Sequence, residues 1–410
     1  MSAPVIERAR SNGDLRLLTP AAISGALQAF PAHLAAYGPL PRRVDLVALA
    51  AVSGLTGRGG AGFPTHRKLA AVAAGRRPVV VANGAEGEPA SAKDHTLLHL
   101  VPHLVLDGLV LAARAVGSKE AYLYVADEPA IPALHAAADL RRRELPMRVV
   151  AAPHAFIAGE ESAVVQGILG RGARPTNTPP RVYERGIGGH PTLVLNVETL
   201  AQLALVARSG GRLLKTRLFT VGGAVRWPGV LEAQHDTSSR ALIDAAGGAT
   251  DAVQAVLVGG YHGAWLPYGP RADLPLTDVA LRPFGAHAGA GVVLALPAGV
   301  CGLRETARVL GYLAAESSGQ CGPCLNGLPA LAGAFAAVAG HGATRAQLDR
   351  VQRVIGLVEG RGACHHPDGS VRFARSALRA FDGELHRHLA GTCDGERSGP
   401  VLPLPERRDR

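Results

Sequence analysis

Short apolar runs alternate with longer amphipathic stretches over the first half of the chain. The runs 77–82, 121–125 and 147–151 have the composition of buried strands, whereas 104–115 and 162–169 have the alanine- and leucine-rich spacing of helices. Strands that alternate with helices predict a parallel sheet covered by helices. We therefore expect an α/β domain over residues 42–212, after an amphipathic helical lead-in at 1–41.

The pattern changes after residue 212. Residues 217–232 and 256–265 predict strands around a short helix at 239–246, so we expect a small α+β module over 213–298, with Trp227 and Trp265 in its core. From 303 to about 390 the spacing is helical, with a polar loop near 360–370, which predicts a helical domain over 299–392. Residues 393–410 are charged and contain proline, which is typical of a disordered tail.

Composition narrows the classes of protein. With 410 residues, of which 47% are hydrophobic, the chain is expected to fold into several domains. The net charge of +10 comes from scattered arginines without a dense basic run, which favours an acidic protein partner over nucleic acid. The N-terminus shows no signal-peptide pattern, and the apolar stretch 97–116 is broken by polar residues and proline, so we expect a cytoplasmic protein without membrane insertion.

A glycine-rich loop, Gly57–Phe63, precedes a helical pattern over residues 68–74. Clustered glycines let backbone amides approach a phosphate closely, and the N-terminus of the following helix favours an anion. Taken alone, the loop is explained equally well as a glycine-rich turn without a ligand.

Further motifs follow in a fixed order: Asn83-Gly84-Ala85-Glu86-Gly87-Glu88, then Lys93-Asp94, Phe156-Ile157-Ala158-Gly159-Glu160-Glu161, and Asn196-Val197-Glu198-Thr199. With the glycine loop, they resemble the flavin-carrying, NADH-oxidising subunit of respiratory complex I and its relatives in soluble hydrogenases and formate dehydrogenases. The resemblance extends from about residue 55 to 389.

This resemblance implies a Rossmann-like domain for FMN and NADH, a ubiquitin-like β-grasp module and a helical domain with a 4Fe–4S cluster. Judged by their residues alone, Glu160 and Glu161 are better explained as the acidic start of a helix, and Lys93-Asp94 as a structural ion pair. The cofactor-binding residues that the resemblance implies are Gly57, Arg58, Gly59, Gly60, Phe63, Lys68, Asn83, Glu86, Glu88, Phe156, Gly159, Glu160, Glu161 and Asn196.

The positions expected to hold NADH depart from the family. Phe63 matches one of the aromatic rings that clasp the adenine, but the other two matching positions are Ala71 and Arg181. Thr178 and Ala85 also replace a family lysine and aspartate. Each lost ring removes roughly 1–3 kcal/mol of base stacking, although a guanidinium at Arg181 can stack in its place.

All five cysteines lie in the last third of the chain, which in a cytosolic protein favours metal ligation over disulfides. Cys321, Cys324 and Cys364 match three cluster ligands of the family, and Ser318 stands at the fourth position. The serine oxygen, Cys301 or His365 would complete a 4Fe–4S cluster, or a 3Fe–4S cluster forms, or the thiols hold zinc or no metal at all. Cys301 and Cys393 are expected to be ordinary buried or tail cysteines.

The leading hypothesis is an oxidoreductase in which NADH reduces FMN and single electrons leave through the cluster to an iron–sulfur or ferredoxin-type protein, with further dehydrogenase subunits as partners. Two alternatives stay open. One is a flavin and iron–sulfur subunit linked to ferredoxin instead of NADH, and the other is a non-enzymatic assembly scaffold. The intact glycines count against the scaffold, since without a ligand they destabilise the loop.

Overall fold

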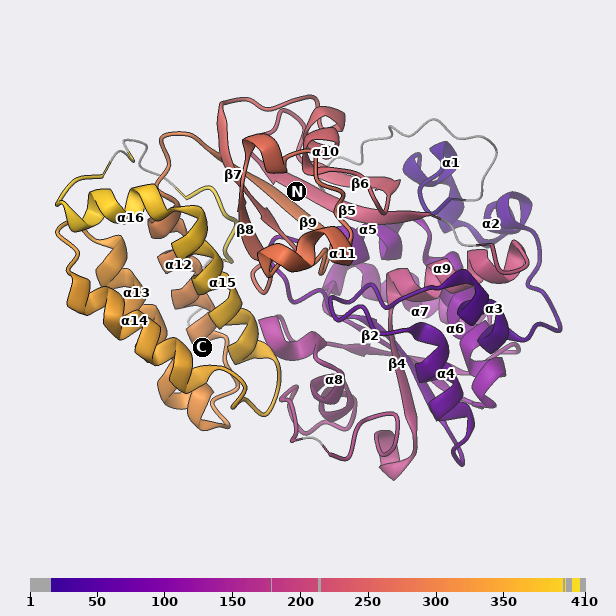
Figure 1. The fold of residues 1–410 in the computed structure, drawn as a ribbon. Coiled ribbons are helices and arrows are strands. Elements are labelled where there is room, and N and C mark those ends of the chain that lie inside the picture. The colour runs from indigo at the N-terminus through magenta and orange to yellow at the C-terminus, as the bar shows by residue number, and fades with distance from the viewer. Residues whose placement is uncertain (1–15, 178, 213–214, 394, 396–399, 406–410) are drawn as a thin grey trace.

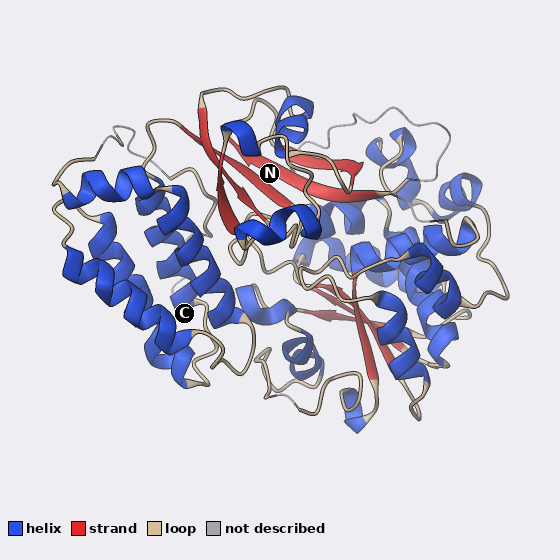
Figure 2. Cartoon of the chain, viewed as in Figure 1, coloured by secondary structure: helices blue, strands red, loops and turns tan. Residues whose placement is uncertain are grey.

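A computed structural model describes residues 16–177, 179–212, 215–393, 395 and 400–405. Strands occur in two separate sheets, whereas the C-terminal third is helical (Figures 1 and 2). The α/β class, the β-grasp module and the helical C-terminal domain predicted from the sequence are therefore confirmed. The domain limits at 41, 212, 298 and 392 stay predictions.

The first sheet is parallel throughout, with the order β3-β2-β1-β4. Its strands are β1 (Val79–Gly84), β2 (Ala121–Val125), β3 (Met147–Ala151) and β4 (Thr192–Asn196). The sequence predicted the first three and missed β4. The helices around this sheet are α3 (Leu46–Ser53), α4 (Thr65–Ala73), α5 (Lys93–Leu100), α6 (Pro102–Val116), α7 (Ile131–Leu140), α8 (Glu161–Ile168) and α9 (Val197–Arg208).

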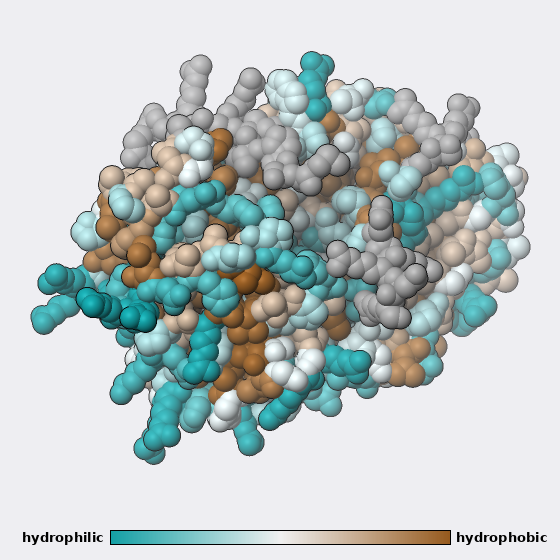
Figure 3. All heavy atoms as spheres, turned by 180° about the vertical axis from the view of Figure 1, so that it is seen from behind, coloured by the Kyte–Doolittle hydropathy of each residue, from teal (hydrophilic) through white to brown (hydrophobic). Residues whose placement is uncertain are grey.

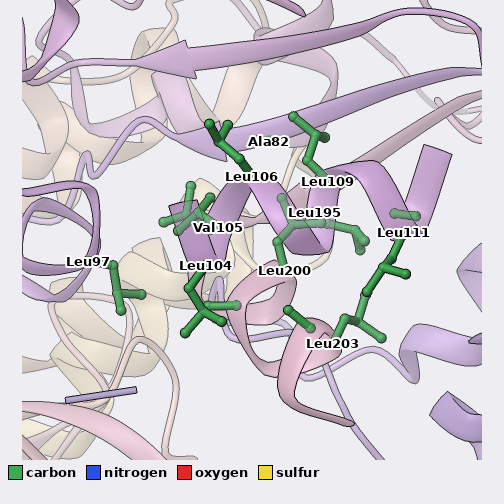
Figure 4. Close-up of a cluster of buried hydrophobic side chains, with 14 of the residues drawn as sticks. Ala82, Leu97, Leu104, Val105, Leu106, Leu109, Leu111, Leu195, Leu200 and Leu203 are labelled. Atoms are coloured by element: carbon green, nitrogen blue, oxygen red, sulfur yellow. The ribbon is translucent and has the colours of Figure 1, made fainter. Parts of the chain in front are cut away.

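The core of this domain is centred on α6 and α9, whose leucines interlock with Ala82 and Leu195 of the sheet (Figure 4). The two helices touch backbone to backbone, because a Cβ at Gly108 would lie 1.9 Å from the carbonyl oxygen of Leu200. The lead-in contains α1 (Pro20–Ile23) and α2 (Phe30–Tyr37). It is joined to α6 by a buried ion pair in which His33 Nε2 lies 2.8 Å from the carboxylate of Asp107.

The second sheet has the order β6-β5-β9-β7-β8, in which the last strand lies between the first and the third. This is the strand order of a β-grasp fold. Trp265 is buried as expected, but Trp227 is 45% exposed, because it lies over the backbone of Gly247 at the rim of the module. The elements are β5 (Thr216–Gly223), β6 (Gly229–Gln234), α10 (Ser239–Ala245), β7 (Val253–Val258), β8 (Ala264–Pro267), α11 (Asp278–Leu281) and β9 (Val292–Pro297).

The helical domain consists of α12 (Gly302–Ala315), a π-helical turn (Pro323–Gly327), α13 (Leu328–Ala339), α14 (Arg345–Val358), α15 (His366–Ala380) and α16 (Asp382–Leu389). The predicted polar loop is shorter than expected, since α15 already begins at His366. The prediction of a disordered tail is wrong for residues 400–405. Leu402 is buried, and the amides of Val401 and Leu402 donate to the carboxylate of Glu305 at 3.1 and 2.9 Å.

Among the described helices, none is by itself long and apolar enough to cross a bilayer. Only α5 and α6 together reach that length, across a bend of 96°. Seen from behind, hydrophilic side chains cover much of the surface, with hydrophobic residues showing between them (Figure 3).

Candidate functional site

The candidate site lies at the carboxyl edge of the parallel sheet. Asn83 and Asn196 end β1 and β4, and they are direct partners in the register of these strands. From β1 the chain continues outward to β2 and β3, and then returns to β4 on the opposite side of β1. In open α/β sheets, ligands bind at such a reversal of strand order. The topology therefore points to the space above the two asparagines.

The glycine loop closes over this edge. The amide of Gly57 donates to the carbonyl of Phe63 at 2.9 Å, which fixes both ends of the loop. The amide of Arg58 donates to the hydroxyl of Thr199 on α9 at 2.9 Å. A Cβ at Gly59 would lie 3.4 Å from Cβ of Asn196. The loop is thus held directly against the start of α9.

The loop fits an anionic ligand such as the phosphate of FMN. Within the described part of the chain, the amides of residues 59–62 donate to no protein acceptor. Gly60 has φ +112°, a conformation that other residues rarely adopt. The next helix, α4, starts directly after the loop without a side-chain cap, and the buried Nε of Arg58 has no partner. Unpaired donors at a helix N-terminus are the features that a phosphate requires.

Three of the predicted cofactor ligands have a further function as helix caps. Glu86 accepts hydrogen bonds from the amides of Asp94 and His95 in α5, at 3.1 and 3.0 Å. Glu160 accepts from the first amides of α8, and Asn196 from the amide of Glu198 in α9. Their side chains are therefore held by secondary structure before any cofactor binds.

Polar groups that the sequence did not place in the site complete it. The buried ammonium of Lys93 contacts Asp94 at 2.5 Å, Asn196 at 3.1 Å and Glu198 at 3.3 Å. The expected Lys93–Asp94 ion pair therefore also orients Asn196. Thr199 and Glu198 stand in the Asn196–Thr199 motif, which was their only signal in the sequence. Separately, Lys68 pairs with Glu161 and donates to the carbonyl of Val194.

The turn 155–160 connects the sheet edge with the helical domain. Asn83 Nδ2 donates to the carbonyl of Gly159 at 2.9 Å. A Cβ at Gly159 would lie 2.6 Å from the carbonyl oxygen of Ala85, so backbone touches backbone here. On its other side, the amide of Phe156 donates to Glu316 at 2.9 Å, and its ring packs 5.5 Å from that of His366, the first residue of α15 (Figure 1).

The cluster residues come together at the end of the helical domain that faces this turn. Cys324 is buried on the π-helical turn, and the thiol of Cys321 and the hydroxyl of Ser318 are hydrogen-bonded to it. Burial, together with the neighbouring Cys321, raises the pKa of the Cys324 thiol to about 12. The pKa of the Cys364 thiol is also raised, chiefly by burial and in part by the charge of Glu160. Glu160 thus links the flavin side to the cluster side.

The arrangement of the sulfurs differs from that of a site for one metal ion. Among the described residues, two groups bring at least three ligand atoms within 4.8 Å of one another, and Cys321, Cys324 and Cys364 form neither. A cube holds each cysteine on a separate iron, so wider spacing suits it. Zinc at these three residues is therefore disfavoured.

Glu88 joins the first domain to the β-grasp module. Its carboxylate accepts from the amide of Tyr261 at 2.7 Å and from that of Ala90 at 3.3 Å. Burial raises its pKa to about 7, although these two hydrogen bonds oppose the shift. Glu88 thus holds the two domains together beside the predicted flavin site.

Because the folded pKa of Glu88 exceeds the unfolded value, its contribution to stability is complete below about pH 4.3 and is lost as the pH rises to about 7. Glu88→Gln removes this titration. The wild type is therefore expected to lose about 1–3 kcal/mol of unfolding free energy relative to Glu88→Gln between pH 5 and pH 8. Urea unfolding of the flavin-free proteins measures the difference. Exposed Glu128→Gln is the control, and an equal response of both variants would contradict the assignment.

The fold and the site define a nucleotide-binding flavoprotein with an iron–sulfur domain. Residues 50–205 match the family model of the Nuo51 FMN-binding domain, and residues 304–388 match that of the NADH-ubiquinone oxidoreductase-F iron-sulfur binding region. The chain belongs to the family of the FMN- and iron–sulfur-containing, NADH-oxidising subunit of complex I and related dehydrogenases, as the sequence predicted.

Individual relatives agree with this family. The second of two F subunits of NADH-quinone oxidoreductase in Rhizobium meliloti (strain 1021) is 29% identical over 95% of this chain and 98% of its own length. The F subunit of the Streptomyces coelicolor enzyme is 29% identical over 85% of this chain and 83% of its own. A solved NAD+-reducing [NiFe]-hydrogenase in the H2-reduced state superposes with a TM-score of 0.78 at 29% identity over 84% of this chain. The chain spans 62% of that hydrogenase chain.

The positions of the predicted NADH clasp are open to solvent. Phe63 is 46% exposed at the end of the glycine loop. Ala71 on α4 and Arg181 are also exposed, and Ala85 is buried beneath Gly159. Thr178 lies outside the described residues. Phe63 therefore presents an aromatic face beside the loop, whereas Ala71 has no ring to offer.

Proposed function

We propose that this protein oxidises NADH at a bound FMN and passes the electrons through an iron–sulfur cluster to a protein acceptor. When bound, FMN accepts a hydride from NADH and releases its electrons singly, which is the form that a cluster carries. The site residues proposed for FMN are those predicted from the sequence, from Gly57 to Asn196.

The protein's own residues perform binding and positioning. The free amides of the glycine loop and Arg58 would hold the phosphate, while Asn83 and Asn196 offer amide groups at the sheet edge. Hydride transfer requires no protein nucleophile, only a nicotinamide held against the flavin. Phe63 is the exposed ring available to stack on the dinucleotide.

One observation carries the electron-transfer part of the proposal. The turn 155–160 contacts Asn83 on the flavin side and reaches Glu316, His366 and Cys364 on the cluster side. A single short segment thus spans the two proposed cofactor sites. Proximity of this kind is what an internal electron path between them requires.

The acceptor is proposed to be an iron–sulfur or ferredoxin-type protein in the cytoplasm, within a larger dehydrogenase assembly. Two observations support a docking site at the cluster loop. Gln320 beside Cys321 is exposed, and Leu325 is 60% exposed although it is a large apolar residue. Both lie on the outer side of the loop, where a partner would approach the cluster closely.

The decisive experiment is to purify the protein without oxygen and to record its visible spectrum before and after NADH. Flavin bands that bleach with NADH are expected. Bands that bleach only with reduced ferredoxin would support the ferredoxin-linked alternative, which the missing rings at Ala71 and Arg181 favour. Absence of both flavin and iron would contradict both hypotheses.

Phe63→Ala tests the stacking directly. We expect the KM for NADH to rise about 5- to 150-fold, the equivalent of roughly 1–3 kcal/mol of lost stacking, with flavin content unchanged. Trp227→Ala is the matched control, since this ring is 45% exposed but lies on the β-grasp module. A KM that stays constant in Phe63→Ala would remove Phe63 from the proposed clasp.

A further inference from the structure

Cys301, His388 and Cys393 meet in the helical domain, away from the cluster loop. Their ligand atoms, two thiol sulfurs and a ring nitrogen, all lie within 4.8 Å of one another. Cys301 immediately precedes α12, His388 lies in the last turn of α16, and Cys393 follows that helix. The expectation that both cysteines are ordinary buried or tail residues does not account for this convergence.

His388 is prepared to act as a ligand. It is completely buried, and its Nδ1 lies 3.1 Å from the carbonyl oxygen of Val338, so Nδ1 carries the proton and donates it. Nε2 therefore presents its lone pair, and it lies 3.5 Å from the sulfur of Cys301. Metal-bound histidines usually have this arrangement, with the second nitrogen donating to a carbonyl. In a tetrahedral zinc site, with bonds of about 2.3 Å to sulfur and 2.0 Å to nitrogen, the two ligands lie roughly 3.5 Å apart.

The surrounding chain encloses the three ligands. A Cβ at Gly395 would lie 2.8 Å from Cβ of Cys301, so the segment after Cys393 runs directly over this thiol. Burial raises the pKa of Cys301 to about 12, so without a metal the thiol is protonated. A divalent cation with two thiolates and a neutral imidazole has no net charge, which is the state that burial tolerates best.

We propose that Cys301, His388 and Cys393 bind one Zn²⁺ ion that fastens the C-terminal segment to the helical domain. Binding releases one proton from each thiol to solvent, while His388 is already neutral and keeps its Nδ1 proton. Two thiolates and one imidazole favour zinc over the harder cations. The carboxylate of Glu384 is engaged by the amides of Gly302 and Leu303, at 2.9 and 3.4 Å, which leaves the fourth position to water.

The test compares the zinc content of the full-length wild type and of Cys393→Ser by elemental analysis after dialysis against dilute Zn²⁺. Zinc held at the cluster loop is common to both proteins and cancels in the difference. We expect Cys393→Ser to contain about one equivalent less per chain. Cys393 is half-buried near the end of the chain, so its replacement leaves the core intact. With Co²⁺ as the probe, the sulfur-to-metal absorption band is expected to weaken in Cys393→Ser and in His388→Gln.

His386→Gln is the matched control, because it lies on the same helix with its side chain 69% exposed. It is expected to keep the full zinc content and the cobalt band. The proposal is overturned if wild type and Cys393→Ser bind equal zinc, or if His386→Gln loses as much as His388→Gln. It is also overturned if reduced wild type binds no zinc here and the two cysteines form a disulfide on oxidation.

Discussion

Gly60→Ala is expected to yield a folded protein that has lost most of its flavin. Gly60 has φ +112°, where an alanine costs about 1–3 kcal/mol. The loop relieves this strain by rotating its peptide units, because no neighbouring atom lies within 4 Å of the added Cβ to resist the change. The rotation redirects the amides of residues 59–62, which have no protein acceptor among the described residues.

The size of the effect follows from the hydrogen bonds at stake. A hydrogen bond to a charged group contributes about 1.5–3 kcal/mol, so loss of two such bonds weakens FMN binding by about 100-fold or more. Flavin per protein after purification and the Kd from fluorescence quenching of added FMN measure it. Retention of wild-type affinity would show that the phosphate does not bind at this loop.

Gly248→Ala separates loss of ligand from general strain. Gly248 has φ +87°, and a Cβ added there also meets no atom within 4 Å, but it lies in the β-grasp module. Both variants should therefore lose comparable stability in thermal unfolding, and only Gly60→Ala should lose flavin. Equal flavin loss in both would assign the effect to the fold as a whole.

The sequence predicted the architecture well wherever its pattern was local. The strands β1, β2 and β3 appeared as short apolar runs between helical stretches. β9, with the sequence Val-Val-Leu-Ala-Leu-Pro, was missed because a strand buried on both faces lacks the alternation of polar and apolar positions. Similarly, β4 follows a glycine-rich turn and was noticed only for the motif at its end.

The remaining differences arise from partners that are distant in sequence. The charged composition of residues 393–410 indicates disorder, but Glu305 pairs with the amides of Val401 and Leu402, 96 and 97 positions away. For the same reason, no spacing rule brings Cys301 next to His388, 87 positions later. The motifs predicted which residues line the sheet edge, whereas their use as helix caps depends on the three-dimensional fold.

Ser318→Cys is expected to increase the iron content of the protein from about three to about four atoms per chain. The Ser318 hydroxyl is hydrogen-bonded to Cys324, within the same group as Cys321. A thiol at residue 318 therefore starts from a contact with the other ligands. Thiolate is a softer and stronger ligand for cluster iron than a serine oxygen, so the fourth iron is retained.

Ser317→Cys adds the same thiol one residue earlier in the chain and is the matched control. Iron and sulfide analysis, with electron paramagnetic resonance of the reduced protein, distinguishes a complete cube from a three-iron cluster. Cys324→Ser, which replaces the buried ligand on the π-helical turn, is expected to lose the cluster. If Ser317→Cys gains as much iron as Ser318→Cys, the gain is non-specific. If neither gains iron while Cys324→Ser still loses it, the serine already serves as the fourth ligand, and the difference from the family lies in the potential of the cluster instead of its occupancy.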